Sequence, residues 1–144
     1  MNTVARHGSF RPDLAEGLLS RGVAGLCDTA LTSKLSAHLH SAFAWNGPHI
    51  RASASFNWGA ASDAEAAGFL RTLAFSRHPD SLVVFGSNVP ALRIPTDWFL
   101  ENLIEASCNA EACFVFGATG VSVFMAQVVE LSVGRAIWAS QVGA

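Results

Sequence analysis

The stretch from Ala112 to Val129 is the feature that most limits how this chain can fold. It is 18 residues long, contains no charged residue and is bounded by Glu111 and Glu130. That length just reaches what a membrane-spanning helix needs. Its many valines and phenylalanines favour strands, however, and its flanks are acidic, whereas membrane segments carry basic flanks. The run therefore predicts a buried β-hairpin, and we expect no membrane association.

Other strands are predicted from the spacing of apolar residues. Apolar and polar residues alternate from His49 to Trp58, which predicts a strand with one buried and one wet face. The apolar run Leu82–Phe85 predicts a short buried strand. The C-terminal strands are predicted at Cys113–Phe116, Val121–Leu131 and Ala136–Ser140, with turns at Gly117–Gly120 and Gly134–Arg135.

Helices are predicted where apolar residues recur every three or four positions. A capping box, Ser62 with Glu65, marks the start of one of them, and Thr96 is a candidate cap for another. The predicted helices run from Pro12 toward Leu26, from Asp28 or Thr29 to Asn46, from Ser62 through Leu73, and from Thr96 through Ser107.

This order of elements predicts an α+β fold. We expect a single globular domain over residues 1–144, in two layers, with the helices packed on one face of a mixed, largely antiparallel sheet and a β-rich C-terminal third. A chain of 144 residues of which 51% are hydrophobic is long and apolar enough for one real core.

Charge and cysteine content exclude several classes of function. The formal net charge of −2 leaves no basic excess, so we expect no direct binding to nucleic acid. The N-terminus lacks the apolar run of a secretion signal. Cys27, Cys108 and Cys113 are odd in number and are expected to be buried apolar residues in a reducing compartment. The expected localisation is cytoplasmic.

No motif for a cofactor is complete. The segment Phe114–Gly120 looks like the strand and glycine turn that open a dinucleotide-binding unit. The third glycine of that fingerprint is missing, and too few residues follow for the rest of the unit. We therefore expect no cofactor.

Metal-binding and catalytic motifs are likewise incomplete. His38 and His40 are two residues apart on a predicted helix and point in nearly opposite directions, so they cannot share a metal ion. The chain has no Gly-x-Ser-x-Gly elbow, and no catalytic residue is assigned. A triad assembled in space around His7, His49 or His78 stays open.

One surface is unusual. Asp97, Glu101 and Glu105 recur every four residues on a predicted helix, with no lysine or arginine three or four positions after any of them. Trp98 and Asn102 lie beside these carboxylates, on the side of the predicted helix that is expected to face solvent. We call these five residues the acidic surface. An outward tryptophan bordered by carboxylates is typical of interface hot spots. The simpler interpretation is a solvated helix face, neutralised in the fold by Arg93 or Arg135.

These observations favour a non-enzymatic protein-binding module. Its acidic surface would mask a basic partner protein, as inhibitor and immunity proteins mask nuclease toxins; the analogy is one of physics. The first alternative is a small enzyme with a pocket between sheet and helices, using His49, Arg51 and Asn57. The second is a self-associating subunit, for example a homodimer.

Overall fold

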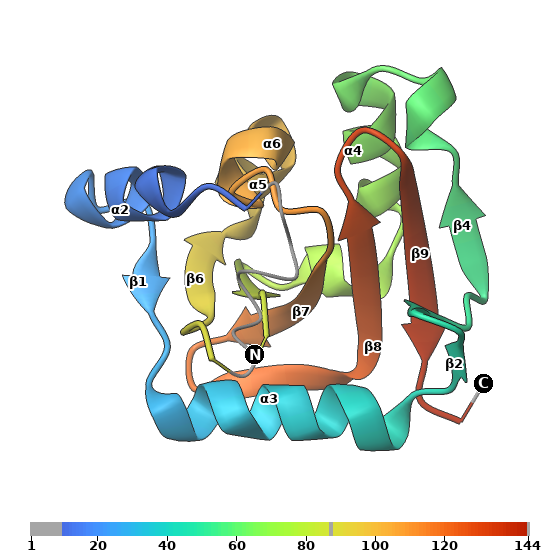
Figure 1. Ribbon diagram of the computed structural model, residues 1–144, viewed down its shortest axis with the longest axis horizontal. Helices are drawn as coiled ribbons and strands as arrows, with labels where there is room; N and C mark the ends of the chain where they lie inside the picture. Colours follow the sequence, from blue (N-terminus) through green and yellow to red (C-terminus); the bar gives the residue numbers. More distant parts are fainter. Residues whose placement is uncertain (1–9, 87, 144) are drawn as a thin grey trace.

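The computed structural model describes residues 10–86 and 88–143, built around one seven-stranded antiparallel sheet (Figure 1). The strand order across it is β1-β6-β5-β7-β8-β9-β4, and a separate hairpin pairs β2 with β3. The strands are β1 (Gly25–Leu26), β2 (Trp45–Asn46), β3 (His49–Ile50), β4 (Ala54–Phe56), β5 (Asp80–Val84), β6 (Leu92–Pro95), β7 (Cys113–Thr119), β8 (Ser122–Ser132) and β9 (Ala136–Gln141). The helices are α2 (Pro12–Ser20), α3 (Thr29–Ala42), α4 (Asp63–Arg71), α5 (Thr96–Glu101) and α6 (Leu103–Ala106), with short 3-10 helices η1 (Trp58–Ala60) and η2 (Ala74–Arg77).

Local side-chain hydrogen bonds explain where two helices begin. The Asp28 carboxylate accepts the Leu31 N–H at 2.7 Å and caps α3. At the start of α4, the Ser62 hydroxyl accepts the Glu65 N–H at 3.1 Å, and the Glu65 carboxylate accepts the Ser62 N–H at 3.0 Å. The predicted capping box is therefore confirmed.

The uncharged run forms the predicted hairpin. Strands β7 and β8 pair in antiparallel register, and the turn between them contains Gly120 at φ +58°. A second strand, and not a helix, follows the glycine turn, as predicted. Within the described residues, no helix is both long enough and apolar enough to cross a membrane.

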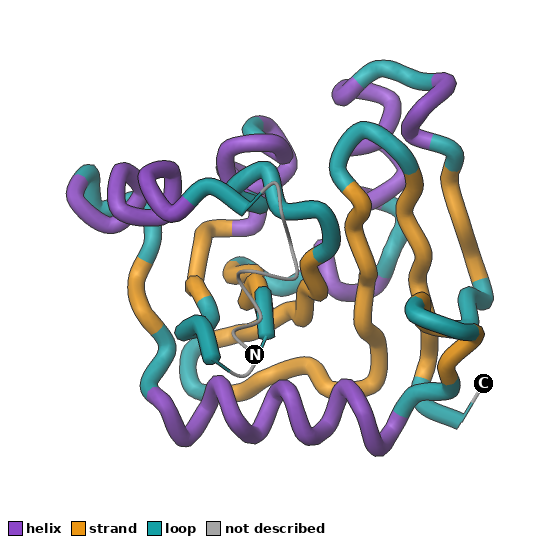
Figure 2. The backbone as a smooth tube through the Cα atoms, viewed as in Figure 1, coloured by secondary structure: helices purple, strands orange, loops and turns teal. Residues whose placement is uncertain are grey.

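The sheet separates two hydrophobic cores. Val83 of β5 packs in one core with residues of α2, α4, α5 and α6, whereas its neighbours Leu82 and Val84 pack in a second core with α3. Figure 2 shows α3 alone at the bottom, with the other α-helices toward the top. The α+β class and the antiparallel sheet are confirmed.

The helices, in contrast, do not all lie on one face, since α3 covers the other. The reason is visible in β5, whose residues from Ser81 to Val84 are all buried. A strand that is buried on both sides must be covered on both sides.

The predicted strand from His49 to Trp58 is divided between two sheets. β3 pairs with β2 in the small hairpin, and β4 pairs with β9 at the edge of the main sheet. Burial nevertheless alternates through the whole segment, from buried Ile50 to buried Trp58 with Arg51, Ser53 and Ser55 exposed. The alternation correctly predicted which side chains face inward, while the strand's partners change midway.

The predicted helix from Thr96 to Ser107 is also divided. Asn102 has φ −140° and ψ 52°, which ends α5, and α6 starts at the next residue. Thr96 does not cap α5, because its hydroxyl is in a buried hydrogen bond of 2.9 Å with the Ser81 hydroxyl, and Pro95 holds the cap position.

Two glycine substitutions test this packing. A Cβ added at Gly117 would lie 2.7 Å from the Phe75 carbonyl oxygen, so Gly117→Ala should lower the free energy of unfolding by about 1–3 kcal/mol. At the exposed Gly68 of α4 an added Cβ meets nothing within 4 Å, so Gly68→Ala should raise it by about 0.5–1 kcal/mol. Urea unfolding measures both values. Equal effects of the two substitutions would contradict a close contact at Gly117 and open space at Gly68.

Candidate functional site

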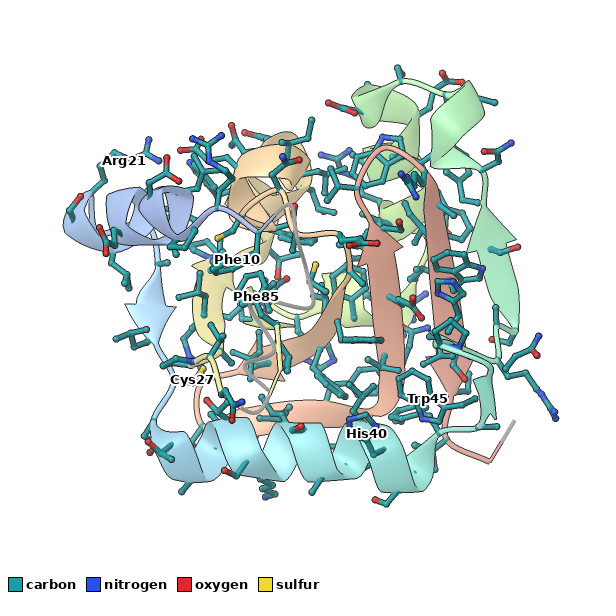
Figure 3. The ribbon with its side chains drawn as sticks, viewed as in Figure 1. Phe10, Arg21, Cys27, His40, Trp45 and Phe85 are labelled. Atoms are coloured by element: carbon teal, nitrogen blue, oxygen red, sulfur yellow. The ribbon has the colours of Figure 1, made fainter. Side chains whose placement is uncertain are left out.

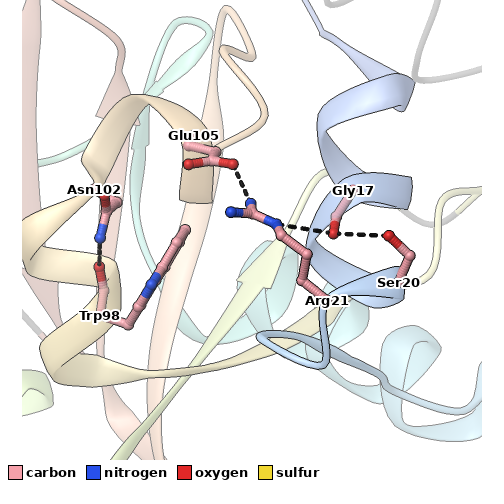
Figure 4. A network of polar contacts seen from close by, with 6 residues as sticks. All are labelled: Gly17, Ser20, Arg21, Trp98, Asn102 and Glu105. Carbon is pink, nitrogen blue, oxygen red and sulfur yellow. Dashed lines mark hydrogen bonds and ion pairs between the residues drawn. The ribbon is translucent and has the colours of Figure 1, made fainter.

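The acidic surface predicted from the sequence is only partly assembled. Asp97 and Glu101 are exposed on α5, but the break at Asn102 places Glu105 on the separate helix α6. Glu105 forms an ion pair with Arg21, the residue that follows the last turn of α2 (Figure 4). Neither arginine suggested by the sequence neutralises this surface: Arg93 pairs with Asp80 at 3.0 Å, and Arg135 forms no ion pair within the described residues.

Trp98 is less exposed than expected. Its ring is half-buried and packs against the core, and the Arg21 guanidinium carbon lies 5.9 Å from the ring centroid. The Asn102 side chain donates a hydrogen bond of 3.0 Å to the Trp98 carbonyl oxygen. A guanidinium at that distance from an indole face is held by a cation–π interaction. Arg21 therefore holds both Trp98 and Glu105, which leaves Asp97 and Glu101 as the free carboxylates of the acidic surface.

A second feature lies on the other face of the sheet. A pocket of about 510 Å³ opens between the C-terminal half of α3, the β2–β3 hairpin and the facing side of the sheet. Pockets that bind small molecules have volumes of this order. The lining residues that matter for its chemistry are His40, Trp45, His49, Phe114, Glu130 and Arg135.

Glu130 is the central polar group of this pocket. It lies on β8 opposite Phe114 of β7 and Trp138 of β9, on the face that α3 covers. Its side chain is 1% exposed, and burial of a carboxylate is costly unless its oxygens are paired. Here both are paired. Oε2 lies 2.6 Å from Nδ1 of His49, and Oε1 accepts the backbone N–H of Ile50 at 2.9 Å.

This contact orients the His49 imidazole. A carboxylate only accepts hydrogen bonds, so Nδ1 carries the proton and Nε2 keeps its lone pair when the ring is neutral. The ring also stacks on Trp138, with centroids 4.4 Å apart. The side chain remains 45% exposed. The arrangement is therefore a fixed imidazole, at the wall of a pocket, whose unused nitrogen can accept a proton.

Aromatic side chains form the neighbouring wall. Trp45 stacks on His40 with centroids 5.3 Å apart and contacts the ring of Phe114 edge-on at 5.7 Å. Figure 3 shows Trp45 and His40 beside the C-terminal end of α3. The Trp45 indole nitrogen is buried and has no hydrogen-bond partner among the described residues. The wall offers a ligand apolar contact.

The other histidines are held elsewhere. His38 hydrogen-bonds to the Met125 carbonyl oxygen at 2.6 Å, and His78 hydrogen-bonds to the Thr119 hydroxyl at 3.0 Å and stacks on Phe124. His7 lies outside the described residues. The part of the chain that the structure describes contains no group of three His, Cys, Asp or Glu side chains able to hold a metal ion.

The sequence linked His49 with the wrong partners. Arg51 and Asn57 are exposed and do not line the pocket, because the strand they were assigned to is divided. The true partner, Glu130, is 81 residues away in the chain. A signal for it was present: Glu130 is a lone charge between Val129 and Leu131 in a predicted buried strand.

The three cysteines are free and buried, as predicted. Burial raises the pKa of Cys108 to about 12, and it also raises the pKa values of Cys27 and Cys113. Because the thiolate is the nucleophilic form, none of these thiols is suited to catalysis near neutral pH.

Thiol labelling tests this conclusion. A raised pKa leaves little thiolate at neutral pH, so a disulfide reagent should leave Cys108 and Cys113 of the native protein unlabelled over minutes. Cys27, whose burial is less complete, should react before them. All three should react at once in denaturant. Labelling is followed by mass spectrometry, and rapid labelling of native Cys108 would contradict its burial.

Comparisons of this chain with family models, curated proteins and solved structures found no match. One fold can host many functions, so the function of this chain follows from the residues of its site.

Proposed function

We propose that this protein is a small enzyme that binds a small molecule in the pocket beside α3 and uses His49 as a general base. The observation that carries the proposal is the 2.6 Å contact between His49 and the buried carboxylate of Glu130 at the pocket wall. A base oriented by a buried carboxylate is the arrangement that makes an imidazole effective in proton transfer. This is the first alternative expected from the sequence, with Glu130 in place of Arg51 and Asn57.

In the proposed reaction, His49 Nε2 takes a proton from a water molecule or from the substrate. Glu130 keeps the ring in the required tautomer and stabilises the imidazolium that forms. When water is the nucleophile, its deprotonated oxygen bonds to the substrate; when the substrate loses the proton, the electron pair left behind forms a double bond. In either case the bond to the leaving group breaks, and the Nε2–H gives that group the proton. Among the described residues, no serine, threonine or cysteine hydrogen-bonds to His49, so the chemistry proposed is direct base catalysis without a covalent intermediate.

The rest of the pocket supports a small substrate that has both an apolar and a polar part. Phe114 and Trp45 line one side, and Leu39 of α3 contributes aliphatic surface. Arg135 reaches the pocket from the β8–β9 turn and forms no ion pair within the described residues, so it is available to a polar group of the substrate. The three free thiols support a reducing compartment, and we place the activity in the cytoplasm.

The proposal is tested by small-molecule binding followed by turnover. A library of small aromatic and aliphatic compounds is screened by saturation-transfer NMR. Binding should be lost in Ala112→Trp, which fills the pocket, and retained in Ala37→Trp, which places the same ring on the exposed side of α3. For compounds that are turned over, His49→Asn should remove turnover, and Glu130→Gln should lower it about 10²-fold or more.

His78→Asn is the matched control, because His78 also stacks on an aromatic ring and makes one side-chain hydrogen bond, but lies outside the pocket. It should leave turnover unchanged. Binding that persists in Ala112→Trp would contradict the pocket, and turnover that survives His49→Asn would contradict the role of the base.

A further inference from the structure

A groove on the opposite face of the sheet is independent of the proposed active site. It runs between α4 on one side and α5 and α6 on the other, with a volume of about 630 Å³. The floor of the groove belongs to the core that packs under α2, α4, α5 and α6. Leu39 and Val84, which line the proposed active-site pocket, belong to the other core, under α3. The sheet lies between the two sites, so both can be occupied at once.

The floor of the groove is apolar. Ala64 and Ala67 lie on one face of α4, and their short side chains leave the space that the groove occupies. Across from them lie Leu100 of α5 and Leu103 of α6. Ile104 also lines the groove and is 42% exposed, which is unusual for a large apolar side chain in this protein. The groove therefore presents apolar surface that no described residue covers.

The rim of the groove is acidic. Asp63, Glu101 and Glu105 line it, against one basic lining residue, Arg71. Glu105 is already paired with Arg21, so Asp63 and Glu101 are the carboxylates that a ligand can pair with. Asp63 accepts a hydrogen bond from the neutral indole of Trp58 at 2.9 Å, which does not cancel its charge. Glu101 is exposed and forms no ion pair within the described residues. A ligand that matches this rim carries positive charge beside an apolar surface.

The geometry points to a helix as the occupant. Every residue that lines the groove belongs to a helix or, in the case of Asn102, to the junction between two helices. An extended peptide would find no free strand edge here to pair with, whereas an amphipathic helix can lay its apolar side chains into such a groove. The nine residues of α4 give the groove a length of about 13 Å, which is enough for two to three turns.

We propose that this groove docks a basic amphipathic helix of a partner protein. Apolar side chains of that helix lie against Ala64, Ala67 and Ile104, and its lysine or arginine side chains face Glu101 and Asp63. The sequence led us to expect a protein-binding role for the acidic surface, and the proposal assigns that role to the groove instead. Glu101, Asn102 and Glu105 of the acidic surface line the groove, while Asp97 and Trp98 lie outside it.

Two synthetic peptides test the proposal on the full chain. One is an 18-residue helical peptide of leucine and lysine in amphipathic spacing, and the other has glutamate at every lysine position. In ¹⁵N NMR titrations, the lysine peptide should shift the amides of Ala64, Ala67, Glu101 and Ile104 and should bind more weakly as salt is added. The glutamate peptide should not bind.

Variants locate the binding site. Ala64→Phe fills the groove at an exposed position and should weaken binding of the lysine peptide at least ten-fold, whereas Ala37→Phe on the exposed side of α3 should have no effect. Glu101→Gln should weaken binding about two- to five-fold, and Glu16→Gln, an exposed acid of α2 outside the groove, should not. The thermal midpoint of each variant shows whether it is folded.

Three results would overturn the proposal. The first is failure of the lysine peptide to bind, and the second is equal binding by the glutamate peptide or by Ala64→Phe. The third is evidence that a second copy of this chain already fills the groove. That would appear as concentration-dependent dimerisation in light scattering, together with shifts of the same amides when no peptide is present.

Discussion

The burial of the Glu130 carboxylate is the constraint on which the α3 side of the molecule depends. Its two oxygens are satisfied by the His49 side chain and the Ile50 backbone, and both groups belong to the β2–β3 hairpin. A carboxylate in the middle of a buried strand would be costly without these partners. The same two hydrogen bonds therefore hold the hairpin against the sheet, fix the imidazole ring and close one side of the pocket.

The sheet makes two separate surfaces available because its central strands are buried on both faces. On the α3 side, Phe114 and Glu130 are neighbours across β7 and β8 and line the pocket, and Trp138 lies beside Glu130 on β9. On the other side, small residues on α4 leave a groove beside α5 and α6. A single small domain can thus bind a substrate on one face and a partner helix on the other. Either proposal can fail without the other.

Much of the fold could be predicted because its signals are local. The Ser62–Glu65 capping box, the turn at Gly134 and the inward-facing residues from Ile50 to Trp58 depend on neighbours within a few positions. The position of α3 and the break at Asn102 depend on what packs against each element, which periodicity does not report. The two-residue strand β1 has no pattern of its own. It is positioned by pairing with β6, and β6 was not predicted either.

The candidate site was harder to predict for the same reason. His49 was named, but Glu130 and Arg21 act across 81 and 84 residues of chain, so helical spacing did not reveal either contact. The only sequence signal for Glu130 is a charged residue in a predicted buried strand. Departures of this kind from the apolar pattern often mark functional residues. Because Arg21 pairs with Glu105 and lies over the Trp98 ring, fewer groups of the acidic surface are available to a partner than the spacing in the sequence indicates.

If Glu130 orients His49 as a base, the imidazole of His49 must hold one particular tautomer. Long-range ¹H–¹⁵N NMR on the ¹⁵N-labelled protein, with the ring in its neutral form, assigns the proton to one ring nitrogen. The proton should lie on Nδ1 of His49, with Nε2 bare, and this preference should be lost in Glu130→Gln. A proton on Nε2 in the native protein, with Nδ1 bare, would contradict this role of Glu130.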